Sequence, residues 1–127
     1  MTLETKSGGL KKGAGGSGWI LPEGLRELAA AGDEEIVAEV FRDFESDTAA
    51  RLTRLRSALH CGHIREAGAQ AHAIKGSAVQ IGAYGVAELC RRIEGMAREE
   101  ADISSAACEL ELEFAVLRSA IARGAGG

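Results

Sequence analysis

Apolar residues recur along the chain at spacings of three and four, the repeat of a helix that buries one face. The repeat predicts four amphipathic helices, over residues 33–59, 64–81, 86–98 and from about 102 onward. No segment alternates apolar and polar residues with the period of two that is typical of a strand. The predicted inward residues are Val37, Val40, Phe44, Thr48, Leu52, Leu55, Leu59, Ile64, Ala67, Ala71, Ile74, Ala78, Ile81, Val86, Leu89, Cys90, Ile93, Ala97, Ile103, Ala107, Leu110, Phe114, Leu117 and Ile121.

A shorter helix is predicted ahead of these four. Pro22 suits a first turn, Leu25 and Leu28 face inward, and Gly32 ends the helix. Asp33 is then a candidate N-cap of the long helix that follows. Because the long helices are joined by short connections, we expect an all-α fold, an antiparallel four-helix bundle with a short extra N-terminal helix.

The ends of the chain have a different composition. Residues 1–18 are mostly Gly, Ser and Lys, which predicts a flexible tail or linker. Order is expected from about Trp19, with the bundle over 19–123 and a frayed C-terminus over 124–127. Between the long helices, the connections are predicted at His60-Cys61-Gly62-His63 and at residues 82–85.

The charge balance excludes some classes of function. Lys and Arg number 15 against 19 Asp and Glu, for a net charge of −4, so nothing resembles a nucleic-acid-binding surface. No stretch approaches the roughly 18 apolar residues of a membrane helix, and no secretory signal begins the chain. Three cysteines without framework spacing are expected to be free thiols in a cytoplasmic protein. Since each helix shows one apolar stripe, we expect a monomer.

The third predicted helix carries a histidine away from its apolar stripe. On a helical wheel His72 lies roughly 130° from the centre of that stripe. Gly68 and Gly76 stand one turn before and one turn after it, and each costs a helix about 1 kcal/mol relative to Ala. Neither lies at the centre of the buried stripe, so helix packing explains them poorly. We expect both glycines to leave the imidazole open to another molecule.

Other side chains are predicted near this histidine. Lys75, three residues on, would stabilise an anion such as a phosphoryl group on the ring. Val79 and Arg65 lie on the same face and are candidate docking residues. If the helices on either side of residues 82–85 are antiparallel, Glu94 lies alongside the imidazole. Its carboxylate would then fix the ring tautomer and leave the other nitrogen as a nucleophile.

Two segments together resemble a known family. His72-x-x-Lys75-Gly76-Ser77-Ala78-x-x-Ile81-Gly82, followed by Glu88-Leu89-Cys90-x-x-Ile93-Glu94, resembles the signature of histidine-containing phosphotransfer (HPt) domains, and the resemblance covers about residues 33–120. It implies a helical bundle whose His72 accepts a phosphoryl group from a receiver-domain aspartate and passes it to another receiver.

The resemblance also implies how the site is divided between partners. Lys75 and Gly76 would belong to the site, and Glu94 would hydrogen-bond the ring. The domain itself would bind neither ATP nor a cofactor, because the receiver of a response regulator or hybrid kinase brings the Mg²⁺. The chain has no P-loop motif, in keeping with a stoichiometric carrier that is not a turnover enzyme.

Two alternative functions stay open from sequence alone. The phosphoacceptor domain of a chemotaxis-type kinase carries a similar histidine motif, although Gln80-Ile81-Gly82 lacks the Phe expected there. An HPt-like scaffold could bind a partner without phosphotransfer. His60-Cys61-x-His63 offers three metal-ligand types but no fourth at recognisable spacing, so no metal site is predicted. High Ala, Gly and Arg content suggests a bacterial source. The chain could be a free-standing carrier or part of a hybrid kinase.

Overall fold

The described part of the molecule is built from helices alone. A computed structural model describes residues 22–123, and this range contains five helices and no strand. The helices are α1 (Glu23–Ala30), α2 (Glu34–His60), α3 (Ile64–Gln80), α4 (Tyr84–Arg98) and α5 (Ser104–Ala122). The predicted all-α class is therefore confirmed. The expectations for residues 1–18, for the start of order near Trp19 and for 124–127 lie outside the described residues.

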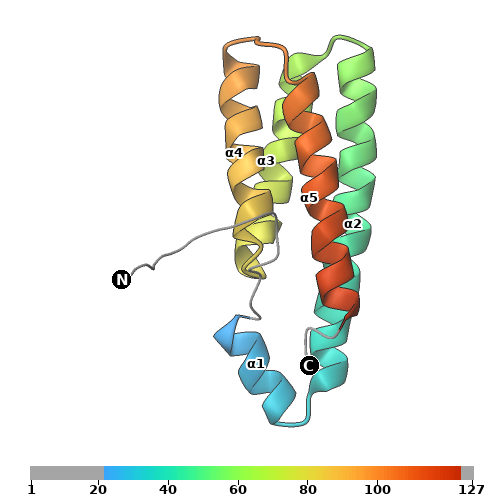
Figure 1. Ribbon diagram of the computed structural model, residues 1–127, viewed down its shortest axis with the longest axis vertical. Coiled ribbons are helices and arrows are strands. Elements are labelled where there is room, and N and C mark those ends of the chain that lie inside the picture. Colours follow the sequence, from blue (N-terminus) through green and yellow to red (C-terminus); the bar gives the residue numbers. More distant parts are fainter. Residues whose placement is uncertain (1–21, 124–127) are drawn as a thin grey trace, which may run out of the picture.

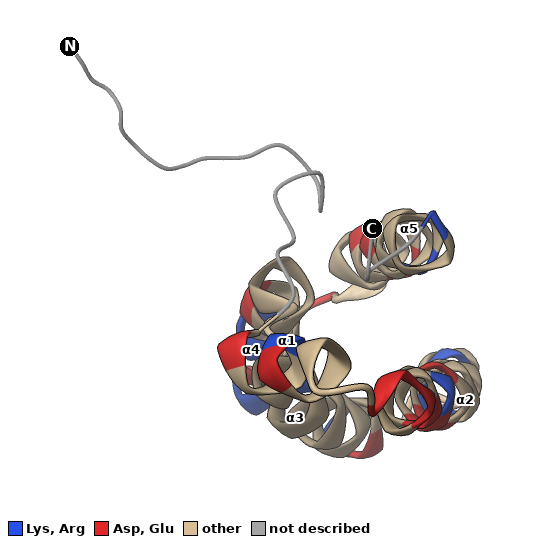
Figure 2. Ribbon diagram, turned by 90° about the horizontal axis from the view of Figure 1, so that it is seen from below, with Lys and Arg blue, Asp and Glu red and all other residues tan. Residues whose placement is uncertain are grey.

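The four longer helices run alternately up and down and form the predicted antiparallel bundle (Figure 1). Going round the bundle, α2 packs on α3, α3 on α4, α4 on α5, and α5 returns to α2. Seen along the bundle, α3 and α5 occupy opposite corners (Figure 2). The short α1 contacts α2, which extends past the other helices at that end (Figure 1). The predicted N-terminal helix at one end of the bundle is thus present.

Helices α1 to α4 end in the same hydrogen-bonded turn, which keeps the connections short. After α3, Gly82 has a φ of +74° and its N–H bonds to Val79 O, while the N–H of Ala83 bonds to Ala78 O at 2.8 Å. This is the Schellman arrangement, whose left-handed residue favours glycine. After α4 the equivalent position is Glu100, with a φ of +56°. The turn after α3 places α4 directly beside it.

The core follows the predicted stripes with small shifts of phase. Val40, which was expected in the core, is only half-buried, and its neighbour Phe41 is buried instead. Likewise, Ala58 is buried while Leu59 is partly exposed. Leu25, Leu28, Leu89 and Ile121 pack partly buried against the core, and Ile64 is half-buried. The side chain of Thr48 is fully buried, and its hydroxyl has no hydrogen-bond partner among the described residues.

Several helix boundaries differ from the predicted ones. Tyr84 and Gly85 belong to α4, so the break after α3 is shorter than expected. Asp33 takes the N-cap position of α2 but makes no side-chain capping bond. Helix α5 begins at Ser104, whose N–H bonds to the carboxylate of Asp102 at 3.0 Å. No helix within residues 22–123 is long and apolar enough to cross a membrane.

Candidate functional site

The exposed histidine stands on the outer face of α3. The neighbouring Ala71 and Ile74 are completely buried against the other helices, which fixes the rotation of α3 about its axis. On the opposite side of that helix, the His72 side chain keeps 70% of its surface exposed. The prediction that His72 points away from the core is confirmed.

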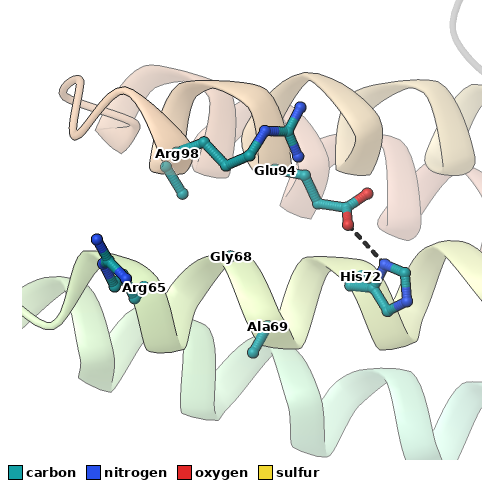
Figure 3. Close-up of a pocket in the computed structure, with 7 residues that line it drawn as sticks. Arg65, Gly68, Ala69, His72, Glu94 and Arg98 are labelled. Carbon is teal, nitrogen blue, oxygen red and sulfur yellow. Dashed lines mark hydrogen bonds and ion pairs between the residues drawn. The ribbon is translucent and has the colours of Figure 1, made fainter.

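Glu94 on α4 bonds directly to this histidine. Its Oε2 lies 2.6 Å from Nδ1 of His72, which is the juxtaposition expected from antiparallel α3 and α4 (Figure 3). An ionised carboxylate only accepts hydrogen bonds, so Nδ1 carries the proton of a neutral ring. The remaining nitrogen, Nε2, then has the free lone pair. Because Glu94 is only 14% exposed, the contact is shielded on one side and open at the ring.

Lys75 is held by the other oxygen of the same carboxylate. Its Nζ lies 2.5 Å from Oε1 of Glu94, as an ion pair. Partial burial would raise the pKa of Glu94, but the contacts of Lys75 and His72 outweigh it and hold that pKa below its ordinary value. Glu94 is therefore ionised at neutral pH. The predicted cation is present beside the histidine, but it is paired within the chain.

The two glycines flanking His72 have different surroundings. Gly68 is buried, and a Cβ added there would lie 2.9 Å from Cβ of Ala97 on α4. The expectation that helix packing does not explain this glycine is wrong, because its missing side chain lets α3 and α4 approach. Gly76 is exposed, and a Cβ there would meet nothing within 4 Å. Only Gly76 is free of a packing role.

A groove of about 480 Å³ runs along the seam of α3 and α4 from His72 (Figure 3). It is lined by Arg65, Gly68, Ala69, His72, Glu94, Ala97 and Arg98. Arg65 and Arg98 flank it from the two helices, and Figure 3 shows the Arg98 guanidinium extending along α4 towards Glu94. Arg98 was not placed in the site by the sequence analysis. Its spacing of four from Glu94 was the signal that could have placed it in the site.

Two exposed apolar side chains lie on either side of the turn that joins α3 to α4. Val79, predicted as a docking residue, is 49% exposed near the end of α3, and Tyr84 at the start of α4 is 67% exposed.

Behind the site, burial raises the pKa of the Cys90 thiol to about 12, and the charge of Glu94 adds to this. Cys90 is completely buried, so its prediction as a core residue is confirmed.

Metal-binding side chains do not gather in the described residues. No group of three or more His, Cys, Asp and Glu in residues 22–123 could hold an ion. His60 ends α2, while exposed Cys61 and His63 follow in the turn. His60, Cys61 and His63 therefore do not gather as a group of metal ligands in the structure.

Known proteins resemble this chain in sequence and in fold. The crystal structure of histidine-containing phosphotransfer protein B from Pseudomonas aeruginosa matches with a TM-score of 0.72 and 24% identity, covering 86% of this chain and 96% of that one. At this identity, the likeness shows the shared fold alone. No curated protein matches the sequence. The sequence model of the Hpt domain matches residues 39–123, well over half of the chain, and includes the histidine and the carboxylate described above. The chain therefore belongs to the Hpt domain family.

Proposed function

We propose that this chain is a phosphoryl carrier, which accepts a phosphoryl group on His72 from the aspartate of a receiver domain and passes it to a response regulator. The observation that carries the proposal is the ring geometry. Nδ1 is bound to Glu94 at 2.6 Å, while the side chain as a whole is 70% exposed. A nucleophile fixed on one side and open on the other suits transfer between two proteins.

In the proposed transfer, the lone pair of Nε2 attacks the phosphorus of a receiver's phosphoaspartate. The N–P bond forms as the P–O bond to the aspartate breaks, and the aspartate leaves as a carboxylate. The positive charge that develops on the imidazole is stabilised by the Glu94 carboxylate at Nδ1. The partner receiver would supply the Mg²⁺, and the chain would need no cofactor of its own.

The cations near His72 have separate proposed roles. Lys75, 2.5 Å from Glu94, is close enough to the ring to exchange the carboxylate for a phosphoryl oxygen once that group is attached. Arg65 and Arg98 make no hydrogen bond or ion pair with the described residues, so their guanidinium groups are available to an acidic partner surface. Gly76, Val79 and the exposed Tyr84 provide the apolar part of the docking face.

The test is transfer from a receiver phosphorylated on its aspartate, in the presence of Mg²⁺. Phosphate on the chain is followed as an acid-labile, base-stable band on a phosphate-affinity gel. We expect label on the wild type and none on His72→Gln. His63→Gln is the matched control, because it removes an exposed histidine in the turn before α3, more than two helical turns from His72, and should label as the wild type does.

The other results decide between the alternatives. Label on His72→Gln would overturn the assignment of the phosphoacceptor. Label from an isolated kinase core with ATP, but not from phosphorylated receivers, would favour the chemotaxis-type phosphoacceptor. Receiver binding with equal affinity by wild type and His72→Ala, without any phosphate uptake, would favour a scaffold.

A further inference from the structure

One oxygen of the Glu94 carboxylate depends on a single cation. Its Oε1 atom is buried, and the Lys75 ammonium at 2.5 Å is the one cation that reaches it within residues 22–123. This contact is an ion pair without the alignment of a hydrogen bond. In the proposed transfer, Lys75 exchanges the carboxylate for a phosphoryl oxygen. A buried carboxylate oxygen would then lose its counter-ion, which is unfavourable unless another cation replaces it.

Arg98 is the cation on α4 that is placed to do this. A helix brings residues three and four apart onto one side, and an acidic residue four positions before a basic one is the favourable order for an ion pair. Arg91, three residues before Glu94, is already held by both oxygens of Glu88. Arg98, four residues after Glu94, makes no hydrogen bond or ion pair with the residues that the structure describes.

The side chain of Arg98 also lies in the required direction. Its guanidinium is folded back along α4, towards Glu94 and the groove that leads to His72 (Figure 3). It passes over Gly95, where an added Cβ would lie 3.7 Å from Nη2 of Arg98. Gly95 therefore places no side chain beside this path. Because Arg98 is exposed, its guanidinium can move towards Glu94 without breaking a contact in the core.

We infer that Arg98 takes the place of Lys75 at Glu94 when the lysine ammonium turns to the phosphoryl group on the histidine. The inference rests on the proposed function. Arg98 is then a positioning residue, which acts through Glu94 and keeps the carboxylate ionised and bonded to Nδ1 of His72 while Lys75 is engaged. Since Oε1 has one cation before and after transfer, the exchange itself neither takes up nor releases a proton.

The first test follows the side-chain carboxyl carbon of Glu94 by NMR in a pH titration of the unphosphorylated chain. Arg98→Ala alone should change the pKa of Glu94 little, because Lys75 still pairs with it. Lys75→Ala should raise this pKa. The double variant should raise it further, by about 0.5 or more beyond the sum of the two single changes. Additive changes in the double variant would overturn the inference.

The matched control in this titration is Arg91→Ala. It removes the same charge from α4 at a similar distance along the helix, but from an arginine that is paired with Glu88. Combined with Lys75→Ala, it should give no excess over the sum of the single changes. An excess as large as that of Arg98→Ala would reduce the effect to general charge and would contradict the exchange.

The second test is the equilibrium of phosphoryl transfer between a receiver and the chain, read from the label on each protein at the plateau. Arg98→Ala should lower the equilibrium constant for phosphorylation of His72 at least about threefold. Arg98→Lys should restore most of it, because an ammonium at this position also reaches Glu94. In a Lys75→Ala background, Arg98→Ala should have no effect, because Arg98 then pairs with Glu94 both before and after transfer.

The opposite results in this second test separate the exchange from its rivals. An effect of Arg98→Ala that persists in the Lys75→Ala background would mean that Arg98 contacts the phosphoryl group directly, and this would contradict the exchange. An unchanged equilibrium in Arg98→Ala would mean that Glu94 needs no second cation. The titration requires no phosphoryl donor. Phosphate uptake with an additive titration would therefore overturn the exchange alone, whereas no uptake by the wild type would overturn the proposed function and the exchange with it.

Discussion

Gly68 and Gly76 stand four residues on either side of His72, and they look equivalent in the sequence. In the structure, Gly68 lets α3 and α4 pack closely together, whereas Gly76 leaves the surface beside His72 open. A Cβ at Gly68 would come within 2.9 Å of Ala97, whereas a Cβ at Gly76 would meet nothing. The comparison shows that one histidine face combines two requirements. The first is a close α3–α4 contact, which brings Glu94 to the ring, and the second is free approach for a partner.

The largest expected effect is that of Gly76→Leu on the rate of phosphoryl transfer. A branched side chain one turn from His72 should obstruct docking and slow phosphoryl transfer about a hundredfold, as small misplacements of reacting groups do. Because nothing packs at Gly76, the free energy of unfolding should not fall. A time course of transfer from a phosphorylated receiver, quenched at intervals, gives the rate of phosphoryl transfer, and urea unfolding gives the stability. An unchanged rate in a folded variant would remove Gly76 from the docking face.

Gly68→Ala should lower the free energy of unfolding. Overpacking of a tight contact costs about 1–3 kcal/mol, and this exceeds the about 1 kcal/mol that Ala gains over Gly in a helix. We therefore expect a net loss of about 1 kcal/mol in urea unfolding. In the double variant with Ala97→Gly, the two Cβ positions exchange and the steric part of the loss should disappear. Additive losses in the double variant would show that the contact with Ala97 is not the cause.

Gly76→Ala should have the opposite sign. With open space around the position, only the helix preference of Ala remains, so the free energy of unfolding should rise by up to about 1 kcal/mol. Thermal and urea unfolding measure this on the same preparation as Gly68→Ala. A loss of stability here would mean that the two glycines are alike after all.

The smallest expected effect is a change in how the free energy of unfolding depends on pH when Glu94 on α4 is replaced. The pKa of Glu94 is lowered in the folded state, so its contribution to stability is present above the ordinary value of 4.5 and is lost as pH falls through the folded pKa. Glu94→Gln lacks this contribution. The difference in free energy of unfolding between wild type and variant should shrink below pH 4.5. A difference that is constant from neutral pH to acid would contradict the role of the ionised carboxylate.

Helical periodicity was enough to predict the helices, their antiparallel order and most of the core. It failed by one position at Val40 and Phe41, because neighbouring residues on a wheel differ by about 100° and both border the same stripe. Gly68 was misread for a different reason. Its burial depends on the distance between α3 and α4, which the residues of both helices determine together.

The surroundings of His72 were predicted in part. Helical spacing and antiparallel packing placed Lys75 and Glu94 near the ring and led to the expected bond between Glu94 and His72. They could not show that the same carboxylate also binds the Lys75 ammonium, since Lys has four rotatable bonds and several partners within reach. Arg98 was missed as part of the groove because its role depends on the direction its long side chain takes along α4.

Within residues 22–123, helix α1 packs against α2 alone, and none of its residues is buried. In hydrogen exchange its amides should therefore open in a local event, well before the cooperative unfolding that exposes those of α3. Mass spectrometry of exchange over seconds to hours would separate the two classes. The end of the molecule that α1 covers can thus open and close while the imidazole of His72 and its bond to Glu94 keep their place.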